Sequence, residues 1–81
     1  MIILAAQRDL DNIVTKEILL RLKKSMQSLA DNPRPHGCIK LMDKEGGYRI
    51  RVSDYRCCYR IDDFNKLIYI YRVKHRREVY R

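Results

Sequence analysis

A chain of 81 residues forms at most one small domain, whose limited core leaves little room for a deep cofactor pocket. Hydrophobic residues make up 46% of the sequence, which excludes a globally disordered chain. The net charge of +8 is uneven, because residues 49–81 hold ten basic and four acidic residues, against eight and six in residues 1–48. This distribution predicts a polyanionic partner, either nucleic acid or an acidic protein, ahead of a membrane surface.

The three cysteines match neither a disulfide framework nor a zinc site, because their number is odd and no C-x-x-C pair is present. Cys57 and Cys58 are adjacent, so in a strand they point to opposite faces. The apolar run Met1–Ala6 is too short for a signal peptide or a membrane span. We therefore expect a single domain over residues 1–81 in a reducing, cytoplasmic compartment, with no metal and no cofactor.

The first part of the chain predicts a short strand followed by two helices. Met1–Leu4 is apolar and β-prone, and Ala5–Val14 has helical spacing. Thr15 is the expected N-cap of a second helix, which ends near Asp31–Asn32 because Pro33 disfavours helical backbone in the residue before it. The apolar stripe of this second helix consists of Ile18, Leu22, Met26 and Leu29. Helices joined so closely predict an αα-hairpin.

The second part of the chain alternates loops with short strands. Asn32–Gly37 is a proline-interrupted loop, Cys38–Met42 an extended segment, and Asp43–Gly47 a turn in which glycine allows positive φ. A turn at Asp62–Asn65 leads into Lys66–Val73, whose continuous apolar run predicts a strand covered on both faces. The helices must bury their stripes on the sheet. These features predict an α+β fold, with an αα-hairpin on one face of an antiparallel sheet of about four strands.

Residues 48–59 predict two strands joined by a tight turn at Ser53–Asp54. In the first strand Arg49 and Arg51 alternate with apolar residues, so the two guanidinium groups share one face. Arg56 in the second strand follows the same alternation. Arginines fixed on one sheet face present forked donors with a geometry suited to phosphate. An ordinary solvated sheet face has the same pattern, so this stretch alone leaves both interpretations open.

A series of short segments extends from residue 32 to residue 80. These segments are Asn32-Pro-Arg-Pro, Lys40-Leu41, Gly47-Tyr-Arg-Ile-Arg-Val, Asp54-Tyr-Arg, Tyr59 and His75-Arg-Arg-Glu-Val-Tyr80. In this order they resemble the RelE family of the RelE/ParE toxin superfamily. The resemblance implies a type II toxin, a ribosome-dependent endoribonuclease that cuts mRNA in the A site and is inactivated by a RelB-like antitoxin in a hetero-oligomer. It also implies a microbial RNase-like fold, with the active site on the sheet face opposite the helices.

The resemblance assigns electrostatic roles to arginines of the central strands. Arg49 and Arg51 match basic strand residues that hold the phosphate and assist attack, and Arg56 matches an arginine that stabilises charge at the scissile phosphate. Some family members have lysines where this chain has arginines, and arginine cannot serve as a base because its pKa exceeds 12. Some relatives use a loop glutamate as the base, where this chain has His36-Gly37. The general base therefore stays unassigned.

The C-terminal tail matches further catalytic positions of the family. Arg76 matches a late basic residue, and Tyr80 matches a near-terminal tyrosine that stacks on a base or joins proton transfer. His75 lies where several relatives have a general acid or base, and histidine titrates near neutral pH. A structural or RNA-contacting role for His75 stays open. Basic residues expected to contact RNA without taking part in the chemistry are Lys40, Arg60, Lys74, Arg77 and Arg81.

Two other classes of function fit parts of the sequence. A ParE-like toxin of the same superfamily binds DNA gyrase and cuts no RNA. A non-catalytic basic module binds nucleic acid or a partner protein through charge alone. For the toxin interpretation, a cationic and partly apolar face predicts an acidic, amphipathic antitoxin segment that folds as it binds.

Overall fold

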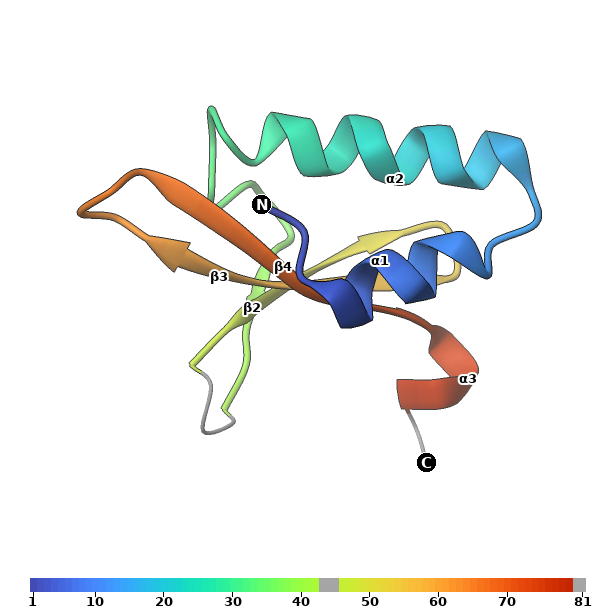
Figure 1. Ribbon diagram of the computed structural model, residues 1–81. Helices are drawn as coiled ribbons and strands as arrows, with labels where there is room; N and C mark the ends of the chain where they lie inside the picture. The colour runs from blue at the N-terminus through green and yellow to red at the C-terminus, as the bar shows by residue number, and fades with distance from the viewer. Residues whose placement is uncertain (43–45, 80–81) are drawn as a thin grey trace.

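The computed structural model describes residues 1–42 and 46–79, apart from the side chains of residues 78 and 79 (Figure 1). The helices and strands are, in chain order, α1 (Leu4–Asp11), α2 (Lys16–Ser28), β1 (Ile39–Lys40), β2 (Tyr48–Val52), β3 (Tyr55–Asp62), β4 (Leu67–His75) and α3 (Arg76–Val79). Most of the predicted turn at Asp43–Gly47 lies outside the described residues, as do Tyr80 and Arg81.

The four strands form one antiparallel sheet in the order β1-β2-β3-β4. The predicted α+β fold is therefore confirmed. The predicted N-terminal strand is reduced to an isolated parallel bridge between Ile2 and Ile70. Backbone hydrogen bonds of 2.9 Å join Ile3 N to Ile70 O and Ile70 N to Met1 O. Because Leu4 already belongs to α1, the N-terminal segment ends after covering the outer edge of β4.

Both main helices bury one side against the same face of the sheet, which we call the core face. Figure 1 shows α2 lying along the sheet and α1 beside β4. In α2 the predicted stripe is confirmed, since Leu22 is fully buried and Ile18 and Met26 are packed against the core. Thr15 occupies the N-cap position of α2, although its side chain makes no capping hydrogen bond. The first helix ends at Asp11, before the predicted end at Val14, which is 93% exposed.

The core joins these helices to alternate residues of the strands. Ala6 and Leu10 of α1 share one buried cluster with Cys57 and Tyr59 of β3 and with Val73 of β4. Tyr59 is fully buried, and its hydroxyl donates a 2.7 Å hydrogen bond to the Pro33 carbonyl oxygen, which ties the loop after α2 to the sheet. The core face is thereby occupied. The opposite face, which we call the outer face, is left for a functional site.

A β-bulge separates two halves of the β3–β4 pairing. Cys58 pairs with Arg72 but Tyr59 pairs with Ile70, so Tyr71 is an extra residue in β4. On the His75 side of the bulge, Lys74 and Arg72 face outward together with their partners on β3, Arg56 and Cys58. Beyond the bulge, Ile70 faces the core. The prediction of a strand covered on both faces is wrong, because β4 is the last strand of the sheet and Leu67, on its outer face, is 38% exposed.

Gly47 → Ala is expected to destabilise the fold by about 1–3 kcal/mol, as overpacking of a filled site does. Gly47 is buried, and an added Cβ would lie 2.5 Å from the Tyr71 hydroxyl and 2.9 Å from the Tyr59 carbonyl oxygen. The second atom belongs to the backbone of β3 and cannot turn away. Thermal unfolding checks the effect. Adding Tyr71→Phe should restore part of the loss, and an unchanged Tm in the single variant would show that the strands yield freely.

The stability of the fold is expected to fall at alkaline pH because Cys57 is buried. Burial raises the pKa of its thiol from 9.0 to about 12, and burial also raises the pKa of Tyr59 above its ordinary value of 10.0. Since the folded pKa exceeds the unfolded one, the contribution of Cys57 is complete below pH 9 and is lost as pH rises towards 12. One such group gives a slope of about 1.4 kcal/mol per pH unit.

Denaturant unfolding between pH 7 and pH 11 measures this slope. Cys57→Ala should make the slope shallower, whereas Cys58→Ala, which changes the neighbouring thiol on the outer face, should leave it intact. Equal slopes in wild type and Cys57→Ala would contradict the assignment to Cys57.

Candidate active site on the outer face of the sheet

The strand register places three basic side chains side by side across the outer face. Arg51 of β2 pairs with Arg56 of β3, which in turn pairs with Lys74 of β4. Neighbouring strands lie about 4.8 Å apart, so these residues, which we call the basic row, form a compact group of cations. The sequence predicted Lys74 only as an RNA contact. The register that brings it beside Arg56 depends on pairing between distant segments.

The predicted phosphate-binding arginines meet in one depression. Gly37, Ile39, Arg49, Arg51 and Arg56 line this arginine hollow, which has a volume of about 210 Å³. Ile39 lies opposite Arg49 in the pairing of β1 with β2, so both face outward. The Arg51 Nε donates a 3.1 Å hydrogen bond to the Ser53 carbonyl oxygen in the β2–β3 turn. The hollow can therefore present several guanidinium donors to one phosphate group.

The loop that contributes Gly37 to this hollow is fixed by Arg34. The two terminal nitrogens of Arg34 donate hydrogen bonds of 3.2 and 3.1 Å to the carboxylate oxygens of Asp63. The guanidinium carbon also lies 5.3 Å from the ring centroid of Tyr48. The hydrogen bonds from Arg34 lower the pKa of Asp63, which keeps its carboxylate ionised and paired. Tyr48 in turn stacks on Tyr59, with ring centroids 6.0 Å apart.

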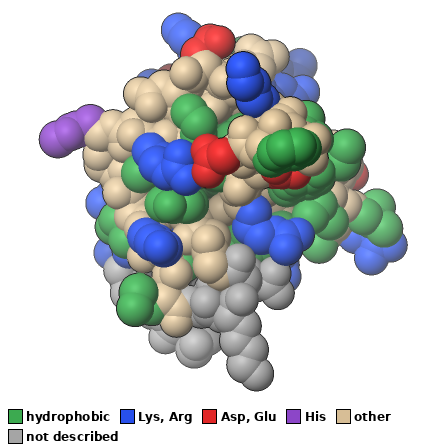
Figure 2. Space-filling model, turned by 90° about the vertical axis from the view of Figure 1, so that its left-hand side faces the viewer, with side chains coloured by type: hydrophobic (Ala, Val, Ile, Leu, Met, Phe, Trp, Pro, Cys, Tyr) green, Lys and Arg blue, Asp and Glu red, His purple; other side chains and the backbone are tan. Residues whose placement is uncertain are grey.

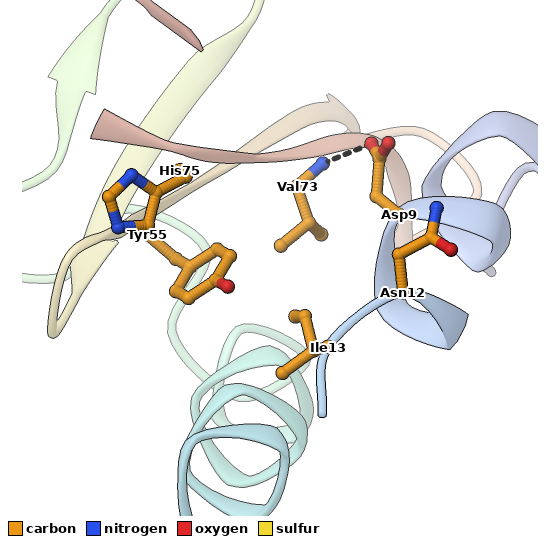
Figure 3. A pocket seen from close by; sticks show the side chains of 6 residues that line it. All are labelled: Asp9, Asn12, Ile13, Tyr55, Val73 and His75. Carbon is orange, nitrogen blue, oxygen red and sulfur yellow. Dashed lines mark hydrogen bonds between the residues drawn. The ribbon is translucent and has the colours of Figure 1, made fainter. Parts of the chain in front are cut away.

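His75 lies apart from the arginine hollow. Its register partner is Tyr55, a core-face residue, and the two rings meet edge to face with centroids 5.2 Å apart. Together with Asp9, Asn12, Ile13 and Val73 they line a separate pocket of about 120 Å³ beside α1 (Figure 3). The structure therefore does not bring His75 together with the strand arginines.

Asp9 closes that pocket by joining α1 to β4. Its carboxylate accepts hydrogen bonds from Arg72 Nε at 2.8 Å and from the Val73 backbone N–H at 2.9 Å, the second of which is drawn in Figure 3. No pattern in the sequence indicates this contact, beyond the presence of the charged residue Arg72 after the apolar run of β4. The contact joins α1 to β4, the strand that contributes Lys74 to the basic row.

The tail begins where β4 ends. The Arg76 backbone N–H donates a 2.7 Å hydrogen bond to the Asp54 carbonyl oxygen, which anchors α3 to the β2–β3 turn. The Arg77 N–H donates to His75 Nδ1 at 3.3 Å. The side chains of Arg76 and Arg77 are exposed and line a second depression with Asp54 and His75. Tyr80, for which the resemblance implies a catalytic role, and Arg81, a predicted RNA contact, lie outside the described residues.

The remaining predicted RNA contacts are spread over the sheet. Lys40 is exposed in β1 and pairs with Tyr48, so alternation turns it away from the arginine hollow. Arg60 lies further along β3 on the outer face, opposite Tyr69. Within residues 1–42 and 46–79, no group of three or more His, Cys, Asp or Glu side chains is placed to hold a metal ion. No helix in this part of the chain is long and apolar enough to cross a membrane.

The fold is that of a toxin domain of the RelE/ParE superfamily, as the sequence predicted. The family model described as the ParE toxin of the type II toxin–antitoxin system, parDE, matches residues 4–80. The chain therefore belongs to the ParE toxin family. No curated protein sequence matches it.

Solved toxin–antitoxin complexes contain chains similar to this one. A chain of the archaeal RelE–RelB complex from Pyrococcus horikoshii is 28% identical, with a TM-score of 0.80, and the match covers 93% of this chain and 90% of that chain. A chain of a RelBE complex from Mycobacterium tuberculosis is 28% identical, with a TM-score of 0.79 and 93% coverage of both chains. A chain of the RelB–RelE complex from Methanococcus jannaschii is 23% identical, with a TM-score of 0.77, and the match covers 99% of this chain and 94% of that chain. At this identity the likeness is one of fold alone.

Proposed function

We propose that this toxin is a ribosome-dependent endoribonuclease, an mRNA interferase that cuts mRNA in the ribosomal A site and so inhibits translation. The observation that supports this proposal is the convergence of Arg49, Arg51 and Arg56 in one hollow, with Lys74 beside Arg56. This convergence favours a phosphate site over a merely solvated sheet face, because the three guanidinium groups line one concave surface.

Cleavage proceeds by attack of a ribose 2′-hydroxyl on the adjacent phosphorus. The 2′-oxygen–phosphorus bond forms while the bond from phosphorus to the 5′-oxygen breaks, which leaves a 2′,3′-cyclic phosphate and a 5′-hydroxyl. The attacking hydroxyl loses a proton and the leaving 5′-oxygen gains one. Arg49, Arg51 and Arg56 stabilise the negative charge of the pentacovalent intermediate, which is commonly the largest contribution to such a rate enhancement.

Proton transfer is assigned to residues around the hollow. Lys74 has the ammonium group of the basic row and, unlike a guanidinium, can donate a proton to the leaving oxygen. Arg76 and Tyr80 keep the roles implied by the resemblance, a second cation and a stacking or proton-donating ring. His75 faces the pocket beside α1, so we assign to it the placing of the tail through Arg77 rather than contact with the phosphate.

A second candidate function follows from the matching family model, which is that of a ParE toxin. A ParE-type protein would bind DNA gyrase and leave RNA intact. Two assays on the same preparation separate the candidates. Primer extension on mRNA, with and without translating ribosomes, detects cleavage, and DNA supercoiling by gyrase detects the alternative.

The proposal predicts new 5′ ends only on translated mRNA and undisturbed supercoiling. Intact mRNA on translating ribosomes, together with blocked supercoiling, would replace it with the gyrase function. Expression of the chain by itself should also arrest growth. A freely expressed protein without any growth defect would count against both forms of toxin.

The proposed partner that restrains the toxin is a RelB-like antitoxin in a toxin–antitoxin hetero-oligomer. The solved structures similar to this chain are complexes of that kind. A groove of about 440 Å³ lies between α2, the N-terminal segment and β4, lined by apolar residues such as Met26 and Ile68 and by Lys23 and Lys66. Its composition suits the apolar side of an acidic, amphipathic helix, whose carboxylates would pair with the lysines.

A further inference from the structure

We propose that the outer face has a nucleobase-binding site at Arg60 and Tyr69, separate from the arginine hollow. The proposed ligand is a base of the bound single-stranded RNA next to the nucleotide that is cut. This proposal rests on the proposed function insofar as RNA is the substrate.

The β-bulge creates this site. Beyond Tyr71 the register pairs Arg60 with Tyr69, which places both on the outer face, while Ile70 between the tyrosines faces the core. Arg60 and Tyr69 line a shallow depression of about 360 Å³ with Ile61, Asp62 and Asp63, which we call the base pocket. It lies near the β3–β4 turn. The end of the molecule with this turn faces the viewer in Figure 2, where acidic side chains lie among basic and apolar ones.

Tyr69 differs from the tyrosines that stabilise the fold. Tyr48, Tyr55 and Tyr59 belong to the core or pack against it, and Tyr69 does not. Its side chain is partly exposed, and within the described part of the chain its hydroxyl makes no hydrogen bond. A tyrosine ring that neither fills the core nor anchors a hydrogen bond offers a free face, and a free aromatic face is the usual platform for an RNA base.

The charges around the base pocket favour a base over a phosphate. Asp62 and Asp63 both line it, and hydrogen bonds from Asn65 and from Arg34, respectively, lower the pKa of their carboxyl groups. Arg34 offsets the charge of Asp63, so Asp62 is the carboxylate that disfavours a phosphate group here. A neutral base is tolerated, and its amino groups can donate hydrogen bonds to the Asp62 carboxylate. Arg60 supplies a planar cation beside the ring; its guanidinium carbon already lies 5.9 Å from the Tyr71 ring centroid.

The spacing separates the base pocket from the cleavage site. Arg56 and Arg60 are four residues apart on β3, which corresponds to about 13 Å at a rise of about 3.3 Å per residue. One nucleotide cannot occupy both places. Between them the outer-face positions of the paired strands are Arg49, Cys58 and Arg72, none of them acidic. An RNA strand held at the arginine hollow can therefore continue along this surface and place a neighbouring base on Tyr69.

The test uses a short single-stranded RNA that contains 2-aminopurine and is 2′-O-methylated throughout, so that it cannot be cut. Stacking on Tyr69 should quench the 2-aminopurine fluorescence. A base–aromatic stack contributes about 1–3 kcal/mol, so Tyr69→Ala should weaken binding about 5- to 150-fold. Tyr69→Phe, which keeps the ring, should bind within about twofold of wild type. Phe64→Ala removes a ring that is 93% exposed in the adjacent turn and should have no effect.

Each outcome decides the proposal. Equal affinity and equal quenching in wild type and Tyr69→Ala would overturn it, as would loss of binding in Phe64→Ala to the same extent. Circular dichroism melts of all variants exclude unfolding as the cause. The proposed function can fail separately. If wild type stacks the probe through Tyr69 but leaves translated mRNA intact, the base pocket is supported and the ribonuclease function is contradicted. If wild type cuts mRNA but binds the probe independently of Tyr69, the ribonuclease function is supported and the base pocket is contradicted.

Discussion

Replacing Arg56 with alanine is expected to lower the rate of mRNA cleavage on translating ribosomes by about 10²–10³-fold, the usual effect of removing one donor that stabilises developing charge. Arg56 is the central residue of the basic row, since it pairs with both Arg51 and Lys74, and it also lines the arginine hollow. Single-turnover cleavage measured by primer extension gives the rate directly. Because Arg56 acts on the transition state, the loss should appear in the rate at saturating ribosome concentration.

The matched control is Arg21→Ala, which removes the same side chain and the same charge from α2. Arg21 is exposed and pairs with Glu17 one helical turn away, far in the fold from the arginine hollow. This variant should cut mRNA at a rate within about twofold of wild type, as expected for an exposed ion pair. Equal losses in both variants would mean that net charge alone governs the activity, and would contradict a specific phosphate site.

Leu22→Ala should cost about 2–5 kcal/mol of the free energy of unfolding, the range for truncating a buried leucine. Leu22 is fully buried in the middle of α2, where it belongs to the cluster that includes Tyr59 and Val73. Small domains have only about 5–15 kcal/mol of net stability, so this loss should also abolish activity at elevated temperature. Equilibrium denaturation with urea measures the change.

Leu20→Ala is the internal comparison, since Leu20 lies on the same helix but is 67% exposed. Its cost should stay below about 0.5 kcal/mol, as for surface substitutions in general. If the two variants lost the same stability, α2 would not pack on the sheet through the Leu22 side, and the assignment of the core face would be wrong.

Periodic patterns in the sequence were sufficient to predict which residues of α2 are buried and which strand arginines share a face. Leu22 and Leu29 repeat at helical spacing, and Arg49 and Arg51 at strand spacing, so local geometry alone determines their direction. The N-terminal segment and the end of α1 were harder to predict. Met1–Ile3 is apolar like a strand, but its partner Ile70 is distant in sequence, and only one bridge forms.

The direction in which Tyr69 and Ile70 point depends on the β-bulge at Tyr71. An uninterrupted alternation from Lys74 and Arg72 would have placed Ile70 outside and Tyr69 inside, which is the reverse of the structure. The apolar run in β4 has no polar residue that marks the change of face, so the sequence could not reveal it. The place of Lys74 in the basic row and the contrasting place of His75 likewise depend on pairing with β3. One extra residue in β4 thus separates the base pocket from the core.

The most direct test of the proposed catalytic site is a structure of the protein on a translating ribosome with an mRNA whose attacking 2′-hydroxyl is methylated. We predict the scissile phosphate within hydrogen-bond distance of Arg49, Arg51 and Arg56, with the outer face towards the mRNA. A phosphate held instead at the pocket formed by Asp9 and His75, or an outer face turned away from the mRNA, would contradict the account.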